Sequence, residues 1–226
     1  MSIVQINSKR EATGETDWAR TSDLENMYEL EYNAYGEEAG NPAIVRKWCD
    51  RNSHICRVLY NKSDRRDFWG SMMMLPLKEE IIFKLLRSEI RDIDLNPESD
   101  ILSFEETGTY DFYVASIIVS AERKQHFLTL MNSMFSFWCE EAPERIIGKI
   151  YVRTVSTEGE MLTRKLFFSP LLHFSNNVYM LDMKRPSPSR FIRNFQYNVN
   201  LKSEGCKNRK NISSATITVK PDLSLI

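Results

Sequence analysis

The segment from Asp111 to Glu141 constrains the fold of this chain more than any other. Residues Phe112 to Val119 form an almost unbroken apolar run, which is typical of a strand buried on both faces. A short polar turn over residues 120–125 follows, and helical periodicity begins after it. The apolar residues of this helix form one stripe: Phe127, Leu130, Met131, Met134, Phe135 and Trp138. The sequence therefore predicts a central strand that leads through a tight turn into an amphipathic helix.

The same arrangement predicts an anion-binding position at the start of that helix. The first N–H groups of a helix have no partner within it, and the helix dipole favours negative charge there. The prediction comes from geometry, because the turn carries no recognisable phosphate-binding signature. An anion is the expected occupant.

Charge is distributed unevenly along the 226 residues, although the net charge is only −1. From Lys184 onward there are nine Lys and Arg against two Asp and Glu, a net of +7 that leaves −8 on the preceding 183 residues. This basic segment could bind nucleic acid by releasing counterions. Its cations are widely spaced and few aromatic residues lie between them, so a solvated extension, or one that packs on the acidic body, is favoured.

Cysteine spacing and hydropathy indicate a cytoplasmic protein. Cys49, Cys56, Cys139 and Cys206 lack the spacing of a metal site, so we expect four reduced thiols and no bound metal. The N-terminal residues have no apolar leader, and no apolar run approaches the roughly 20 residues that cross a bilayer. The sequence therefore predicts no membrane association.

Local signals divide the rest of the chain into a mixed α/β order. A capping box at residues 22–25 predicts a helix to about Gly36, and Asn41-Pro42 predicts a second helix to about Arg51. Periodicity predicts strands at 16–20, 55–60, 67–75, 101–104, 146–155, 167–174 and 178–183, and helices at 79–91 and 157–166.

Composition divides the chain into three parts. Residues 1–14 form a polar N-terminal segment, residues 15–184 form the folded domain, and residues 185–226 form a basic C-terminal extension that begins at a Pro-Ser-Pro-Ser sequence. An alternating run at residues 212–219 could add an edge strand to the sheet or stay mobile.

This order resembles the GNAT superfamily of acyl-CoA-dependent N-acyltransferases over about residues 16–183. Residues 68–77, FWGSMMMLPL, are similar to the third strand of that family, with its early glycine and trailing Pro-Leu. Residues 115–120, ASIIVS, are similar to its fourth strand, and residues 162–168, LTRKLFF, to the end of a late helix. The resemblance implies a central mixed, mostly antiparallel sheet flanked by helices.

The resemblance also implies that acetyl-CoA or another acyl-CoA binds between the fourth and fifth strands. Backbone groups of Ile118 and Val119 would contact the pantetheine arm. The phosphate loop would fall on Lys124, Gln125, His126, Phe127 and Thr129. Phe127 and Thr129 replace two glycines of the family, which weakens phosphate binding as a prediction because glycine permits the closest approach of a backbone. Lys124 keeps a basic group in the loop.

The catalytic positions of the family carry other residues in this chain. Tyr113 stands where some members have a carboxylate base, and Thr163 stands where many have an acidic tyrosine. Tyr113 could accept a proton only with a pKa well below about 10, and a threonine hydroxyl could only hydrogen-bond a thiolate. Each also has a structural interpretation, as a core aromatic and a helix-surface threonine. His126, His173 and the pair Glu105-Glu106 are further candidate bases.

Three functions are compatible with these residues. The first is transfer of an acetyl or other short acyl group to a small-molecule or peptide amine, with catalysis by positioning and backbone donors. The second is a GNAT-like domain without turnover that senses a ligand or binds a protein, which the missing glycines, carboxylate and tyrosine favour. The third, a nucleic-acid accessory factor, depends on the basic extension alone. A homodimer is compatible with each.

Overall fold

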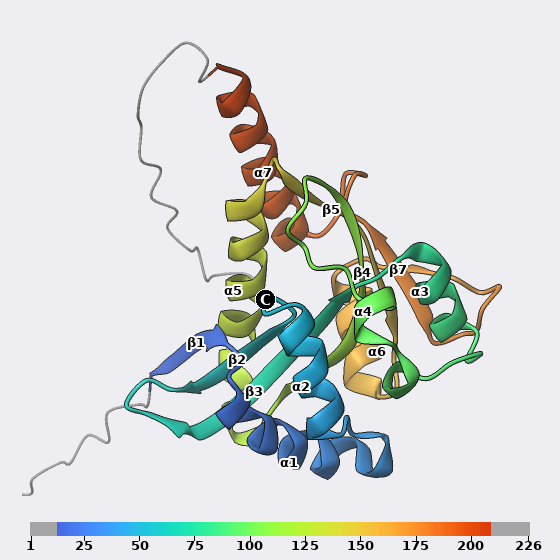
Figure 1. Ribbon diagram of the computed structural model, residues 1–226. Helices are drawn as coiled ribbons and strands as arrows, with labels where there is room; N and C mark the ends of the chain where they lie inside the picture. Colours follow the sequence, from blue (N-terminus) through green and yellow to red (C-terminus); the bar gives the residue numbers. More distant parts are fainter. Residues whose placement is uncertain (1–12, 209–226) are drawn as a thin grey trace, which may run out of the picture.

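A seven-stranded sheet forms the centre of the computed structural model, which describes residues 13–208 (Figure 1). Its strand order is β1-β2-β3-β4-β5-β7-β6. Only β4 and β5 are parallel, and the other neighbouring strands are antiparallel. The strands are β1 (Gly14–Trp18), β2 (Cys56–Asn61), β3 (Asp64–Pro76), β4 (Gly108–Val119), β5 (Arg145–Arg153), β6 (Ser169–Pro170) and β7 (Val178–Asp182). The predicted mixed, mostly antiparallel sheet is confirmed.

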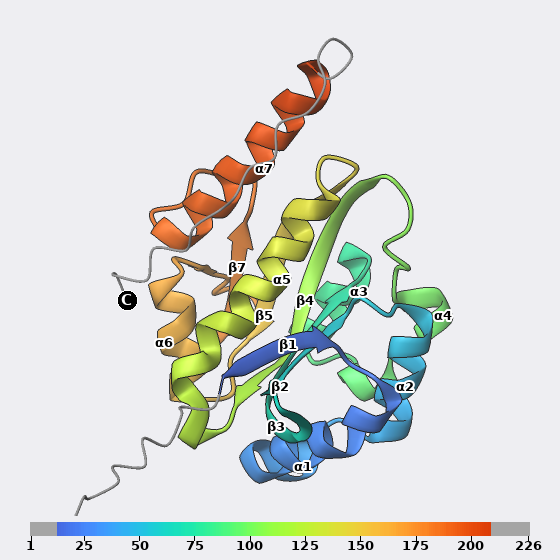
Figure 2. The ribbon, with the colours of Figure 1, turned by 90° about the vertical axis from the view of Figure 1, so that its left-hand side faces the viewer.

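Helices cover both faces of this sheet. One face packs against α1 (Leu24–Tyr35), α2 (Pro42–Arg51) and α3 (Glu79–Leu86). The other packs against α5 (Phe127–Glu141) and α7 (Arg190–Asn208), and Figure 2 shows α5 lying across it. Short elements complete the chain: α4 (Pro97–Asp100), α6 (Thr157–Lys165) and the 3₁₀ turns η1 (Thr21–Asp23), η2 (Gly36–Glu38), η3 (Asp92–Asp94) and η4 (Ala121–His126). Within residues 13–208, no helix has the length and apolarity that a membrane crossing requires.

Strand β4 contributes side chains to both hydrophobic cores. Phe112 and Val114 pack with the residues of α5, whereas Tyr113 and Ala115 pack on the side of α1 to α3. Successive residues of a strand point to opposite faces, so an apolar strand placed at the centre of a sheet fills both sides. The predicted central strand leading into an amphipathic helix is therefore confirmed.

Several predicted boundaries change in the structure. Asn41 caps α2 as predicted, because its side chain accepts a hydrogen bond from the Ala43 N–H at 2.8 Å. The first helix starts instead at Leu24, and the Asp23 carboxylate accepts from the Arg20 N–H at 2.7 Å. The strands predicted at 101–104 and 167–174 shrink to one bridge and to β6, since Phe104 and Phe167 adopt positive φ angles, which end extended backbone.

Helix α7 lies where the sequence predicted a basic extension. Its apolar residues Phe191, Ile192 and Phe195 pack on α5, and the Phe195 ring centroid lies 5.1 Å from that of Phe135. These residues form a helical stripe, but arginines and asparagines between them dilute the apolar signal. The alternating run predicted at 212–219 lies outside the described residues.

A glycine on β3 allows close packing against β4, and its replacement tests the sheet. A Cβ at Gly70 would lie 2.5 Å from the carbonyl oxygen of Ile118, which belongs to the backbone and cannot move aside cheaply. We expect Gly70→Ala to lower the free energy of unfolding by about 1–3 kcal/mol, measured by urea denaturation. Gly108→Ala is the matched control, because a Cβ there meets nothing within 4 Å. Equal losses for the two variants would contradict this interpretation.

Candidate functional site

Strands β4 and β5 pair over only part of their length. Their parallel register begins at Gly108 opposite Arg145 and ends at Val114 opposite Val152. Strand β4 continues to Val119 and there pairs with β3 alone. Residues Ala115–Val119 therefore present one row of backbone groups that no strand of the described sheet takes up. We call this row the open edge of β4.

The register of β3 decides which backbone groups face the open edge. The Ser120 N–H donates to the Trp69 carbonyl at 2.8 Å, and backbone groups alternate in direction along an antiparallel pair. By this alternation, Ile117 and Val119 direct their N–H and C=O groups toward the open edge. The carbonyl of Ile118 faces Gly70 on β3. Of the two residues predicted to contact a pantetheine arm, Val119 therefore directs its backbone groups to the open edge, whereas Ile118 directs them to β3.

A bulge lies at the start of the open edge. Met73 pairs with Ser116 and Met74 with Val114, so Ala115 has no partner residue on β3. A bulge disrupts the hydrogen-bond ladder locally and frees backbone groups. The bulge adjoins the point where pairing with β5 stops. A free N–H donor at this point could polarise a carbonyl group held beside the strand.

The entry to α5 differs from the predicted phosphate loop. Turn η4 continues directly into α5, with the Arg123 N–H donating to the Ser120 carbonyl at 2.9 Å and the Phe127 N–H donating to the Lys124 carbonyl. The amides of Arg123 and Phe127 are thus used by the helical turns, with a break in helical φ and ψ at Arg123 between the two turns. In this geometry the first N–H groups without a helical acceptor belong to Ala121 and Glu122. The N–H groups of Ala121 and Glu122 are thus available to an anion at this end of the helix, and the phosphate contacts predicted at residues 124–129 stay predictions.

The predicted phosphate-binding side chains separate into two groups. Lys124, Gln125 and Thr129 are exposed, so they can reach a ligand in solvent. His126 stacks on Trp69 with ring centroids 4.8 Å apart, and Phe127 packs against the core under α5. The side chain of Phe127 is therefore directed into the core. Cofactor contacts for the exposed group stay predictions.

The surroundings of the two predicted catalytic residues do not favour acceptance of a proton by either side chain. Burial raises the pKa of Tyr113 to about 12, so its phenol keeps its proton at neutral pH. The condition for Tyr113 to act as a base is therefore not met. Thr163 is buried, and its hydroxyl donates to the Glu160 carbonyl of the same helix at 2.8 Å. Their catalytic roles stay predictions, and the geometry favours other groups.

Helix α1 brings to the open edge two residues that sequence reasoning missed. The Tyr35 hydroxyl lies 3.4 Å from the Ile117 carbonyl and donates to it. Glu31, one turn earlier, is only 5% exposed, and its Oε2 accepts from the Gly40 N–H at 3.4 Å. A signal was present in the sequence, because Glu31 follows Leu24 and Met27 on the buried stripe of the helix. An acid on an apolar stripe is an exception that calls for a partner.

The environment of Glu31 disfavours its charge. Burial raises its pKa above the ordinary value, and the nearby Asp92 raises it further. The Ser116 hydroxyl and the Gly40 N–H lower the pKa of Glu31. The Ser116 hydroxyl is close enough to the Glu31 carboxylate to lower its pKa, but no hydrogen bond of normal geometry joins Oε1 of Glu31 and Oγ of Ser116 to any described residue.

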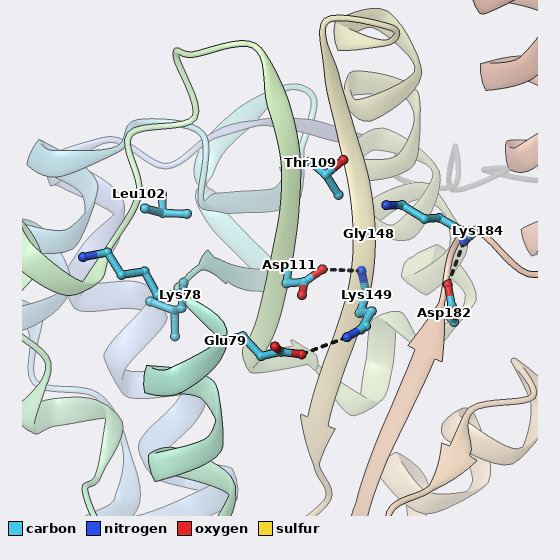
Figure 3. Close-up of a pocket in the computed structure, with 10 residues that line it drawn as sticks. Lys78, Glu79, Leu102, Thr109, Asp111, Gly148, Lys149, Asp182 and Lys184 are labelled. Atoms are coloured by element: carbon cyan, nitrogen blue, oxygen red, sulfur yellow. Dashed lines mark hydrogen bonds and ion pairs between the residues drawn. The ribbon is translucent and has the colours of Figure 1, made fainter.

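Two cavities lie away from the open edge. One, of about 370 Å³, is at the beginning of β4 and β5 (Figure 3). Two of its acids have partners within it: Lys149 Nζ lies 2.8 Å from Glu79 Oε1, and the Asp111 carboxylate accepts from the Lys149 backbone N–H at 2.8 Å. The other, of about 440 Å³, is lined by residues that include His54, Phe137 and Arg145. Within residues 13–208, no three His, Cys, Asp or Glu side chains form a group that could hold a metal ion.

Comparison with known proteins identifies the fold. No protein-family model and no curated protein sequence matches the chain. Among solved structures, an acetyltransferase of the GNAT family from Staphylococcus aureus Mu50 superposes with a TM-score of 0.50 at 9% identity, over 75% of this chain and 99% of that one. The chain has the GNAT fold. The resemblance predicted from three short sequence matches is confirmed at this level.

Other solved structures match the GNAT fold of this chain less closely in shape. Ard1 from Thermoplasma volcanium has a TM-score of 0.47 at 13% identity, over 74% of this chain and 94% of that one. NAA60 from Arabidopsis thaliana, in complex with a bisubstrate analogue, has a TM-score of 0.47 at 13% identity, over 74% of this chain and 95% of that one. The structure from Staphylococcus aureus, at 9% identity, shows the fold and leaves the reaction to be argued from the site.

Proposed function

We propose that this protein is an acyl-CoA-dependent N-acyltransferase that transfers an acetyl or other short acyl group to an amine. The observation that carries the proposal is the open edge of β4. The pantetheine arm of coenzyme A is extended and contains two amide groups. Such an arm can hydrogen-bond to a free strand edge as an added strand would, and here Ile117 and Val119 present the matching groups.

Both ends of an arm placed in this way would meet suitable groups. Toward the bulge, backbone donors beside Ala115 would face the thioester carbonyl. Toward the end of β4, the N–H groups of Ala121 and Glu122 would face the diphosphate, with Lys124 exposed nearby. Positioning of thioester and amine together would then supply much of the rate acceleration.

The acceptor that fits best is a cationic amine, on a small molecule or a peptide. The first 183 residues carry a net charge of −8, which attracts cations to the body of the protein. Two acids near the open edge, Glu31 and Asp92, also favour a cationic acceptor there. The acetyltransferase from Staphylococcus aureus with this fold supports the class of reaction.

Calorimetry with acetyl-CoA tests the proposal. We expect binding to the wild-type protein and release of free thiol when a panel of primary amines is added. Val119→Pro removes an N–H that faces the open edge and is compatible with extended backbone, so we expect acetyl-CoA to bind at least about tenfold more weakly. Val119→Ala keeps the N–H and is expected to bind like the wild type.

Two outcomes would contradict this function. Absence of acetyl-CoA binding at millimolar concentration would rule out the proposed coenzyme and, with it, the transferase function. Binding without thiol release above background for any amine would favour a ligand-sensing module without turnover. If Val119→Pro remains folded and binds acetyl-CoA as tightly as Val119→Ala, the coenzyme does not use the open edge.

A further inference from the structure

We propose that Glu31 is the proton acceptor for the attacking amine, positioned on α1 beside the point where β4 and β5 stop pairing. The inference rests on the proposed function. It assigns to a helix a role that the sequence comparison had placed on β4 at Tyr113. Three independent features of the structure support it.

The first feature is position. Ser116, whose hydroxyl acts on the Glu31 carboxylate, directly follows the bulged residue Ala115. Tyr35 lies one helical turn after Glu31 and donates to the Ile117 carbonyl on the open edge. Residues four apart share a face of a helix. The face of α1 that carries Glu31 therefore lies over the segment where the thioester would be held.

The second feature is unfilled hydrogen-bonding capacity. Apart from the approach of Ser116 to Glu31, Oε1 of Glu31 and the hydroxyls of Ser116 and Ser71 are buried without a hydrogen bond of normal geometry to any described residue. Ser71 and Ser116 lie opposite Ile118 and Met73 in the β3–β4 register, on the side that faces α1. Buried polar groups are nearly always paired in native proteins. Three unpaired oxygens on one side of the open edge indicate a place for a polar group that the chain does not supply.

The third feature is the sign of the surrounding charge. The negative charge of Asp92 adds to burial in raising the pKa of Glu31. Tyr35 and Cys56 also interact electrostatically with Glu31, and burial raises the pKa of each. Asp92 also contributes to the raised pKa of Tyr113. These groups are acidic or neutral, so a protonated amine would supply the positive charge that would stabilise the Glu31 carboxylate.

The reaction balances with Glu31 as the only side-chain base. The carboxylate takes one proton from the ammonium group, directly or through one water. The amine nitrogen then attacks the thioester carbonyl carbon, and the new C–N bond forms. As the tetrahedral intermediate collapses, the C–S bond breaks and the nitrogen gives its second proton to the sulfur. Free thiol and amide leave, and Glu31 releases its proton to solvent.

Glu31→Gln and Glu29→Gln form a matched pair for the test. Both lie on α1 and lose one negative charge, but Glu29 is exposed. We expect Glu31→Gln to bind acetyl-CoA like the wild type while kcat/KM for the amine falls by about 10²- to 10⁴-fold, the usual range for general-base catalysis. Glu29→Gln should keep wild-type values for both.

The pH profile distinguishes a catalytic from a structural role. Glu31 must be deprotonated to act, and its pKa is raised, so wild-type kcat/KM should fall as the pH drops through a value above the ordinary glutamate range. Glu31→Gln should lose this limb of the profile, and Glu31→Asp should keep it at a lower rate. A raised acid pKa costs folding stability at neutral pH, so the amide variant should be no less stable than the wild type.

The outcomes separate the two claims. Loss of acetyl-CoA binding in the wild type would overturn the proposed function and this inference with it. If the wild type acylates amines and Glu31→Gln does so at the same rate, with the same acid limb, only the role of Glu31 is overturned.

Discussion

Replacing Phe195 with alanine is expected to lower the free energy of unfolding by about 3–5 kcal/mol, the usual cost of removing a buried aromatic ring. The Phe195 ring is buried and meets Phe135 at 5.1 Å and Trp138 at 6.4 Å between centroids. Its loss would leave a cavity between α5 and α7 that backbone adjustment fills only in part. Urea denaturation, followed by circular dichroism, measures the change.

Tyr197→Ala is the control for this prediction. Tyr197 lies on the same helix and is 63% exposed, so its removal should change stability by less than about 0.5 kcal/mol. If the two variants lose the same stability, α7 does not contribute to the core under α5. A larger loss for Phe195→Ala would show that the chain beyond residue 185 contributes to the stability of the folded domain.

Arg65→Met is expected to cost about 3–5 kcal/mol, because it leaves buried charge without a partner. The Arg65 guanidinium lies 2.6 Å from Asp23 and 2.8 Å from Asp17, and it donates to the Trp18 carbonyl at 2.9 Å. The Asp23 side chain is only 3% exposed. The hydrogen bonds from this arginine link β1 and the start of α1 to β3.

The neighbouring arginine gives the matched control. Arg66 also pairs with an aspartate, but its side chain is 90% exposed, so Arg66→Met should change stability by less than about 1 kcal/mol. Chemical denaturation of both variants tests the difference. Near-equal effects would show that the Arg65 cluster is hydrated and adds little.

The pH dependence of stability gives a second test of the Arg65 cluster, which consists of Arg65, Asp17 and Asp23. Burial alone would raise the pKa of Asp17, but hydrogen bonds from Arg65 hold it below its ordinary value. Stability from such a lowered pKa is present above the unfolded value and is lost as the pH falls toward the folded one. The gap between wild type and Arg65→Met should therefore narrow below about pH 4.

The elements that sequence reasoning predicted well carry strong local signals. The run from Phe112 to Val119 is apolar throughout, and Asn41-Pro42 combines a cap with a favoured first helical residue. Such signals depend on a few adjacent residues and survive in any tertiary setting. The β4–α5 unit and its neighbours were enough to indicate the GNAT fold, although no protein-family model matches the chain.

The parts that sequence reasoning missed depend on contacts distant in the chain. Whether Ile117 or Ile118 faces the open edge is set by pairing with β3, about fifty residues earlier. The proximity of Glu31 to Ser116 becomes visible only when α1 packs over β4. Arg123 and His126 both pack on Trp69, which holds turn η4 against β3 at the entry to α5.

The open edge of β4 is unusual in its location, since it lies inside the sheet between two neighbouring strands. Free strand edges at the rim of a sheet invite other chains to pair with them, and proteins commonly keep such rim strands short. Here the outer strands are short, with five residues in β1 and two in β6. The open edge of β4 is not part of this rim, because it lies between β3 and β5 and begins where the pairing of β4 with β5 ends, at Val114 opposite Val152. It therefore offers no terminal strand that a sheet of another molecule could extend.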